Sequence, residues 1–199
     1  ASGDSTFGTW TYAYDASSNL ATTTDPKSQI VVRTYDALDR PTTENYTGQA
    51  GTEITYTYDS CTRGTGKPCS IASNSATTSY TYDYAGNVLA ETRNIQNTAY
   101  ISTTTFDWQG NAGLITYPDL SDVKYTRNVQ NKIEKIEQRE NGGLYTHIVS
   151  DFDYGPHGLV TFALYGNGVS TTRAYADDEL YRLNSITTEA VNTGIGSGG

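Results

Sequence analysis

The sequence predicts an all-β chain made of about eight repeated antiparallel β-hairpins, and three observations lead to this fold class. First, the 199 residues contain 17 Tyr and no Met, and Thr is frequent; β-branched and aromatic residues fit a pleated, half-buried surface. Second, a Tyr-x-Tyr-Asp pattern recurs at a nearly fixed interval. Third, turn residues separate the alternating segments. A hydrophobic content of 36% excludes a disordered chain.

The repeat is anchored on the last residue of Tyr-x-Tyr-Asp, which recurs eight times in steps of 21 to 25 residues. These anchor positions are Asp15, Asp36, Asp59, Asp83, Asp107, Asn128, Asp153 and Asp178. The aromatic residues directly before them include Tyr14, Tyr35, Tyr58, Tyr82, Phe106 and Phe152. Eight units of similar length over nearly the whole chain predict a repeat architecture.

Each unit begins with a strand that ends at the anchor. Tyr80 and Tyr82 are two positions apart, so their rings are expected on one face of that strand. Asp83 can bond the backbone two residues on, and Gly86 suits the last turn position, where φ is often positive. Gly110 takes the same place in the next unit. The Asp and Gly positions are therefore predicted to reverse the chain.

A second strand follows each turn, as in Leu20–Thr24, Val88–Thr92 and Lys132–Ile136. The stretch 132–140 has helix-forming residues, but its place in the repeat favours a strand. Each unit then carries another turn signal, such as Asp25-Pro26, so two strands of about seven to eight residues fit in each unit. The chain should form some sixteen short strands. A long sheet without helices coils under its own twist, which predicts a curved, spiralling β-sheet.

Domain boundaries follow from the extent of the repeat. Residues 1–9 are expected to be an N-terminal flank, residues 10–193 the hairpin region, and residues 194–199 an added Gly/Ser-rich tail. Because the pattern starts abruptly, we expect an excised fragment, from which a targeting signal would be missing. The two edges of that fragment, near residues 5–14 and 183–193, are expected to recruit strands from other copies of the chain.

The charge and the polar residues exclude several classes of function. The formal net charge is −9 and the basic residues are scattered, which argues against a nucleic-acid or anionic-membrane partner. No apolar run is long enough to span a membrane. One Asp per turn forms a row and does not form a converging catalytic pair, and neither His147 nor His157 belongs to a catalytic or zinc motif. We expect no catalytic residues, metal or cofactor, and interpret 177–179 as a solvated turn.

Two pairs of residues each leave an alternative open. Cys61 and Cys69 flank a turn with Gly64, Gly66 and Pro68, which favours a local disulfide and an exported protein over two buried thiols. The tyrosine rows, together with Trp10 and Trp108, could stack on sugars. The recurrence of the rings in every unit favours the interpretation that they pack the sheet.

The segment YTYDYAGNVLAET, residues 80–92, closely resembles the YD repeat of the RHS (rearrangement hotspot) family. That family includes bacterial RHS toxins, the C component of bacterial insecticidal toxin complexes and the animal teneurins. The resemblance covers residues 10–190, including ITYPDLSDVKYTRNVQNKI, LYGNGVSTTRAYADDELYRLNSI and the cysteine-bearing YDSCTRGTGKPCSI. Departures occur where the turn Gly is replaced by Ser18, Asp39 or Tyr181, where Arg127-Asn128 replaces Tyr-Asp, and in the longer turn 153–158.

This resemblance implies a strip of hairpins that spirals into a hollow shell enclosing another polypeptide, usually a toxic domain. We therefore expect a non-enzymatic segment of an RHS/YD-repeat shell whose partner is an enclosed toxin or effector, in a bacterial protein that is secreted or displayed on the cell surface. The alternative is a cell-surface adhesin or carbohydrate-binding strip whose partner is a glycan or surface receptor.

Overall fold

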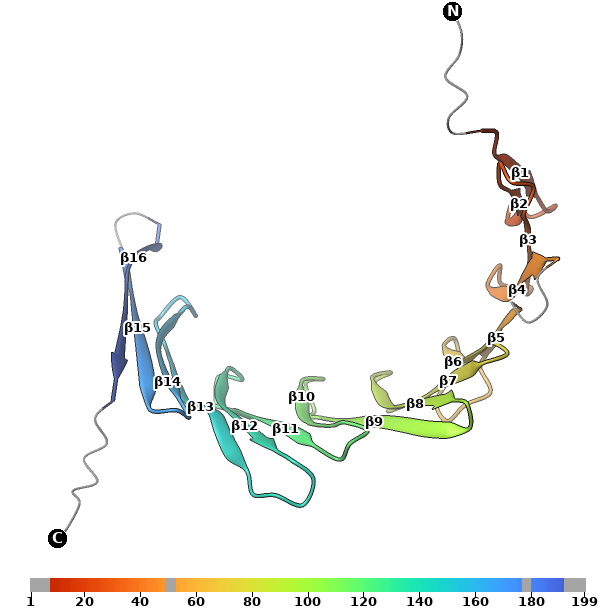
Figure 1. Ribbon diagram of the computed structural model, residues 1–199. Coiled ribbons are helices and arrows are strands. Elements are labelled where there is room, and N and C mark those ends of the chain that lie inside the picture. The colour runs from red at the N-terminus through yellow and green to blue at the C-terminus, as the bar shows by residue number, and fades with distance from the viewer. Residues whose placement is uncertain (1–7, 49–52, 177–179, 192–199) are drawn as a thin grey trace, which may run out of the picture. The chain divides into compact units, whose positions relative to one another are not determined.

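The computed structural model describes residues 8–48, 53–176 and 180–191, and within them the chain is all-β with no helix (Figure 1). The sixteen strands of these ranges are β1 (Thr11–Tyr14), β2 (Leu20–Thr24), β3 (Ile30–Tyr35), β4 (Pro41–Thr47), β5 (Ile54–Tyr58), β6 (Pro68–Ala72), β7 (Ala76–Tyr82), β8 (Val88–Ile95), β9 (Thr98–Phe106), β10 (Ala112–Thr116), β11 (Asp122–Arg127), β12 (Ile133–Arg139), β13 (Thr146–Tyr154), β14 (Val160–Tyr165), β15 (Val169–Ala176) and β16 (Arg182–Ala190).

The strands follow one another through a single antiparallel sheet in chain order, from β1 to β16. The sheet is open, because β1 and β16 are its two end strands. The prediction of an all-β chain of repeated antiparallel hairpins is confirmed. The stretch that could have been helical is strand β12, because its apolar Ile133 and Ile136 follow a turn at the place where each unit starts its return.

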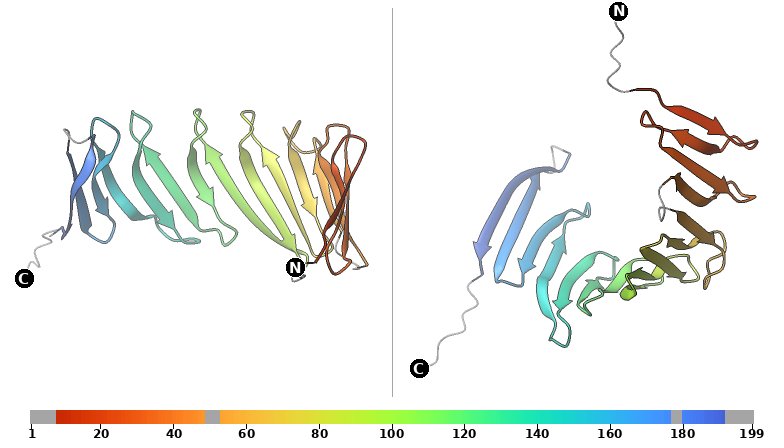
Figure 2. Two further views of the ribbon diagram at one scale, coloured as in Figure 1. Left: turned by 90° about the horizontal axis from the view of Figure 1, so that it is seen from above. Right: turned by 45° about the vertical axis from the view of Figure 1, so that its right-hand side comes forward.

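The chain divides into two compact units, Ala1–Ser102 and Thr103–Gly199. The first contains β1 to β8 and the start of β9, and the second contains the rest of β9 and β10 to β16. Within the second unit the strands lie side by side with alternating direction, as Figure 2 shows in its left view. Connections from odd to even strands therefore share one edge of the sheet, which we call the turn edge.

Every hairpin that crosses the turn edge contains a β-bulge at the same place. In the first, Ala13 pairs with Thr22 but Tyr14 pairs with Leu20, which leaves Ala21 as the extra residue. The same shift occurs in the seven other hairpins of this kind in the described part of the chain. A bulge bends the strand and increases its local twist, so the same local bend recurs in each of these hairpins.

Little of this sheet is deeply buried. Among the described residues, no large side chain falls below 2% exposure, and the buried apolar residues are Cys69, Tyr82, Val149 and Ala163. A fold that buries so little apolar surface gains less from the hydrophobic effect than a two-layer domain does. Polar and aromatic contacts between adjacent strands must therefore contribute a larger share of its stability.

A polar network around Asp122 is the clearest such contact away from the turn edge. Asp122 begins β11 and is 2% exposed. Its carboxylate accepts hydrogen bonds from Thr116 Oγ1 at 2.7 Å, from the Tyr145 hydroxyl at 3.2 Å and from the Arg139 guanidinium. These bonds, the Thr116 bond first, and the Arg139 charge lower the pKa of Asp122 although burial opposes the shift.

We predict that Asp122→Asn lowers the stability of the chain at pH 7 and that this difference shrinks in acid. Because the folded-state pKa of Asp122 is depressed, its contribution is complete above the unfolded value of about 3.9 and is lost as the pH falls below it. Urea unfolding of both proteins between pH 7 and pH 3 measures this. The exposed Asp153→Asn serves as the control; equal losses at every pH in the Asp122 variant would contradict the prediction.

Candidate functional site

The turns at the turn edge are built alike from the anchor residue. Asp83 N donates to Asn87 O at 3.0 Å, Gly86 N donates to Asp83 O at 3.2 Å, and Asp83 Oδ1 accepts from Asn87 N at 2.8 Å. A short acidic side chain two to four residues before these amides replaces the backbone partners that the turn removes. The same side-chain bonds are made by Asp15, Asp36, Asp107 and Asn128.

These bonds depress the pKa of the anchor carboxylates. The backbone amide of the residue four positions on is the largest cause for Asp15, Asp36 and Asp107, and the Asn87 side chain is the largest cause for Asp83. Hydrogen bonds to the ionised form favour it. These Asp anchors are thus held as anions, and their carboxylate oxygens accept hydrogen bonds from their own turns.

Replacement of the turn glycine does not change the backbone path. Ser18 has φ 72° and Asp39 has φ 59°, close to the φ of Gly86 at 91°. Asn131, at this place in the sixth unit, has φ 62°. Non-glycine residues in this region carry a cost, which small polar side chains tolerate best. The turn geometry that these departures put in question is therefore retained.

The alignment of the seventh unit on Asp153 is wrong. The turn starts at Gly155, whose N donates to Leu159 O at 2.9 Å, and Asp153 lies inside β13 opposite Phe162. The aromatic residue before the turn is therefore Tyr154 instead of Phe152. The sequence pattern indicated Asp153 because the true anchor in this unit, Gly155, has no side chain that marks it. Asp178 of the eighth unit lies outside the described residues.

In four units the tyrosine before the turn bonds to the backbone of the preceding unit. Its hydroxyl donates to the carbonyl of the residue that starts the preceding unit's returning strand. The four bonds are Tyr35 to Leu20 (3.0 Å), Tyr82 to Pro68 (2.6 Å), Tyr154 to Ile133 (2.6 Å) and Tyr175 to Val160 (3.0 Å). Phe106 and Arg127 occupy this place in two units, and they have no hydroxyl to donate.

A basic residue directly before the returning strand covers the tyrosine ring of the next unit. Arg40 lies 4.3 Å from the Tyr58 ring centroid, Lys67 lies 5.2 Å from that of Tyr82, and Lys132 lies 4.9 Å from that of Tyr154. Cations over aromatic faces within about 6 Å are attracted by the ring quadrupole. Each such residue therefore links its own turn to the neighbouring one.

Lys67 also reaches the glycine of the neighbouring turn. Lys67 Nζ donates to Gly86 O at 3.2 Å, and a Cβ at Gly86 would lie 2.6 Å from that nitrogen. Gly86 also has a positive φ of 91°. A side chain at Gly86 would therefore be strained and would displace the lysine.

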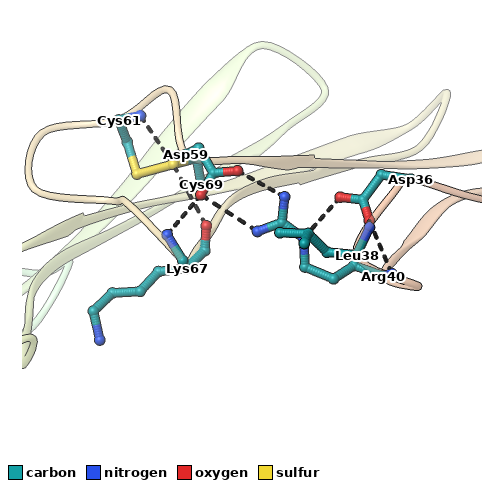
Figure 3. Close-up of polar contacts among 8 residues, drawn as sticks. Asp36, Leu38, Arg40, Asp59, Cys61, Lys67 and Cys69 are labelled. Atoms are coloured by element: carbon teal, nitrogen blue, oxygen red, sulfur yellow. Dashed lines mark hydrogen bonds and ion pairs between the residues drawn. A yellow bond between two sulfur atoms is a disulfide. The ribbon is translucent and has the colours of Figure 1, made fainter.

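Arg40 forms the densest of these links (Figure 3). Its guanidinium bonds Asp36 in its own turn at 2.7 Å and Asp59 in the next turn at 2.6 Å. The Asp59 bond, followed by the Asp36 bond, raises the pKa of Arg40 above its usual value. For Asp59, Arg40 is the first cause of a lowered pKa, and the Gly66 backbone amide is the second. Two anchor carboxylates are thus joined through one cation.

The third unit contains the longest turn at this edge, and a disulfide closes it. Cys61 and Cys69 are joined, with their Cα atoms 5.3 Å apart. Cys69 occupies the extra position of the bulge and is buried. At the base of the loop, Asp59 N donates to Lys67 O. A Cβ at Gly64 would lie 2.2 Å from one sulfur and 2.6 Å from the other. Glycine is therefore needed at residue 64 because the disulfide packs against its backbone.

The sequence also singled out two tryptophans and candidate metal ligands. Trp10 is 51% exposed and Trp108 is 91% exposed, and they belong to different compact units. In the described part of the chain, no group of three or more His, Cys, Asp and Glu is placed to hold a metal ion. No helix there could cross a membrane.

The contacts of Arg40, Lys67 and Lys132 with the next unit were not predicted from the sequence. Each directly precedes a returning strand, so their common place in the repeat was a usable signal. It was weak because Asn19, Asn87 and Asn111 occupy that place in other units. Tyr154 was missed because its anchor is Gly155, and Tyr175 was missed because it does not directly precede Asp178, on which the eighth unit is aligned.

An open sheet of consecutive β-hairpins defines this chain as a β-hairpin repeat protein. Solved structures share its fold. A crystal structure of TcdB2-TccC3 matches 92% of the chain with a TM-score of 0.77 and 16% identity. TcdB2-TccC3-Cdc42 matches with a TM-score of 0.76 and 16% identity, and the Photorhabdus luminescens Tc holotoxin pore with TccC3-D651A matches with 0.76 and 17%, each over 92% of this chain.

The chain spans 10% of the length of each of these matched chains. No protein-family model and no curated protein sequence matches it. The resemblance to the RHS/YD-repeat family, which includes components of bacterial toxin complexes, is confirmed at the level of the fold. The structural likeness extends over nearly all of the chain although few residues are identical.

We predict that Tyr82→Phe destabilises the chain by about 1 kcal/mol, because the Pro68 carbonyl loses its hydroxyl partner. Tyr80→Phe, two residues earlier on the same strand, is the matched control and should change stability less. Urea unfolding followed by circular dichroism gives both values. Equal effects of the two substitutions would show that the hydroxyl bond between units is not a stabilising contact.

Proposed function

We propose that this chain is a non-enzymatic segment of an RHS-type shell that encloses or scaffolds a toxin or effector polypeptide. The single observation that carries the proposal is the bond between a turn tyrosine and the preceding unit, which recurs in four units, at Tyr35, Tyr82, Tyr154 and Tyr175. These four side chains hold neighbouring units together. A wall requires this continuous attachment, whereas an active site requires convergence at one place.

The fold comparison supports the same proposal. The matched structures are toxin-complex chains; one is a complex with Cdc42, and another is a holotoxin pore. The chain aligns with a tenth of each matched chain, as one stretch of a longer wall would. The partner we propose is therefore a polypeptide covered by the sheet, and the protein of which this wall is a part would be exported by a bacterium.

The proposal predicts that this chain can replace the aligned segment of TcdB2-TccC3 without exposing the enclosed polypeptide. Limited proteolysis of the chimera should leave that polypeptide intact, and electron microscopy should show an assembled complex. The matched variant carries Tyr→Phe at residues 35, 82, 154 and 175, and should make the polypeptide cleavable. An assembled chimera whose enclosed polypeptide is cleaved as fast as free polypeptide would contradict a wall function.

Two further expectations stay predictions. The adhesin alternative depends on Trp10 and Trp108, which are exposed but far apart in sequence. Self-association depends on β1 and β16, which are the end strands of the sheet and are exposed along their lengths. Unpaired strand edges are templates for other strands, and further repeats of the same protein would satisfy them equally well.

A further inference from the structure

A small cavity lies at the turn edge of the second compact unit, beside the seventh turn. Its volume is about 240 Å³, and its walls include Pro156, His157, Thr161, Arg173 and Tyr181. All of these residues belong to Thr103–Gly199. The cavity combines aromatic rings with the permanently charged Arg173, and pockets lined by apolar groups with a few polar ones can bind ligands.

Arg173 has a structural counterpart in the chain that shows what such an arginine needs. Tyr35 and Tyr175 both bond the first residue of the preceding returning strand, and Arg33 and Arg173 each lie two residues before them. Arg33 Nε pairs with Glu44 at 3.2 Å, and its NH1 donates to Thr23 at 3.0 Å. The guanidinium of Arg33 is thus held by residues on both adjacent strands.

Both of these partners are replaced around Arg173. Its cross-strand neighbour, at the place of Glu44, is Ile186. Ala163, three residues beyond Val160, takes the place of Thr23, which lies three residues beyond Leu20. Neither Ile nor Ala can accept a hydrogen bond from a guanidinium. Among the described residues, no carboxylate lies within ion-pair distance of Arg173. Within the described residues Arg173 is thus a half-buried cation without a counter-ion, and such a cation favours an anion from outside.

Two aromatic residues of the cavity lining, His157 and Tyr181, are in contact, and Tyr181 has an uncommon backbone conformation. The rings of His157 and Tyr181 are stacked with centroids 3.5 Å apart. Tyr181 has φ 56°, a value that is rare for a bulky residue and carries a cost. That conformation is accompanied by a bond from Tyr181 N to Ala176 O at 3.0 Å. The two rings, whose planes are tilted by 33°, line the same cavity as Arg173.

We propose that this cavity binds a carboxylate carried on a small apolar or aromatic body. The guanidinium of Arg173 would pair with the carboxylate, because its fork of donors matches the two oxygens. The rings of His157 and Tyr181 would contact the apolar body. A cavity of 240 Å³ is smaller than the sites of drug-sized ligands, which start at about 300 Å³, so one such group fills it. The carboxylate comes either from a free small molecule or from the terminus of a polypeptide.

The test is a titration of the full chain with benzoate, followed by NMR of the backbone amides. Benzoate should cause saturable shifts at the cavity residues, whereas benzyl alcohol, which has no charge, should not. Arg173→Gln should weaken benzoate binding about tenfold or more, because a hydrogen-bonded charge pair is lost. Arg93→Gln, a surface arginine paired with Glu91, should bind benzoate as the natural chain does.

Two further arms separate the sources and protect the test against misfolding. N-acetylphenylalanine and its amide represent a polypeptide terminus; if the acid binds much more tightly than benzoate, a polypeptide is the source, and otherwise a free small molecule is. His157→Ala changes only the exposed turn and should also weaken benzoate binding, so the proposal can be tested even if Arg173→Gln does not fold.

Three outcomes would overturn the proposal: equal binding of benzoate and benzyl alcohol, unchanged benzoate binding in both cavity variants, or binding that occurs only after Asp177, Asp178 and Glu179 are replaced by their amides. The last would mean that acids of the chain itself hold Arg173.

Discussion

The hydrogen bond from a turn tyrosine to the backbone of the preceding unit is the interaction on which this sheet depends. A sheet whose described residues include no large, fully buried side chain cannot rely on a deep core. A hydroxyl that donates to a carbonyl of the adjacent hairpin fixes the distance between the two and shields a strand end. The β-bulge in the returning strand recurs in all eight hairpins of this kind in the described part of the chain, including that of Arg127, so the bulged register does not require an aromatic residue.

Most positions of the turn act on the neighbouring unit as well as on their own. The anchor Asp caps its own turn, whereas the residue before the returning strand extends a cation to the next tyrosine and the next glycine. In Arg40 the two roles meet, since it joins the carboxylates of two successive anchors. Adjacent hairpins are therefore coupled pair by pair, as nearest-neighbour repeats are.

Variation among the units follows from this coupling. The third unit lengthens its turn but closes it with a disulfide, and it still presents Lys67 to Tyr82. The eighth unit keeps the hydroxyl bond of Tyr175 but loses the partners that an arginine has in the second unit. A cavity is found where those partners are missing. Departures from the repeat thus change local chemistry, and at Phe106 and Arg127 they also remove the hydroxyl bond between units.

The sequence by itself determined the all-β class, the number of hairpins, the strand identity of β12 and the use of Asp83 and Gly86 in a turn. These features depend on local periodicity and on side chains that bond within four residues. Only the tertiary structure decided that the hydroxyl of Tyr82 bonds Pro68, that Lys67 covers its ring, and that the hydroxyl of Tyr154 bonds Ile133. Those contacts join residues 14 or more positions apart, and their pairing depends on the bulged register, which no local pattern specifies.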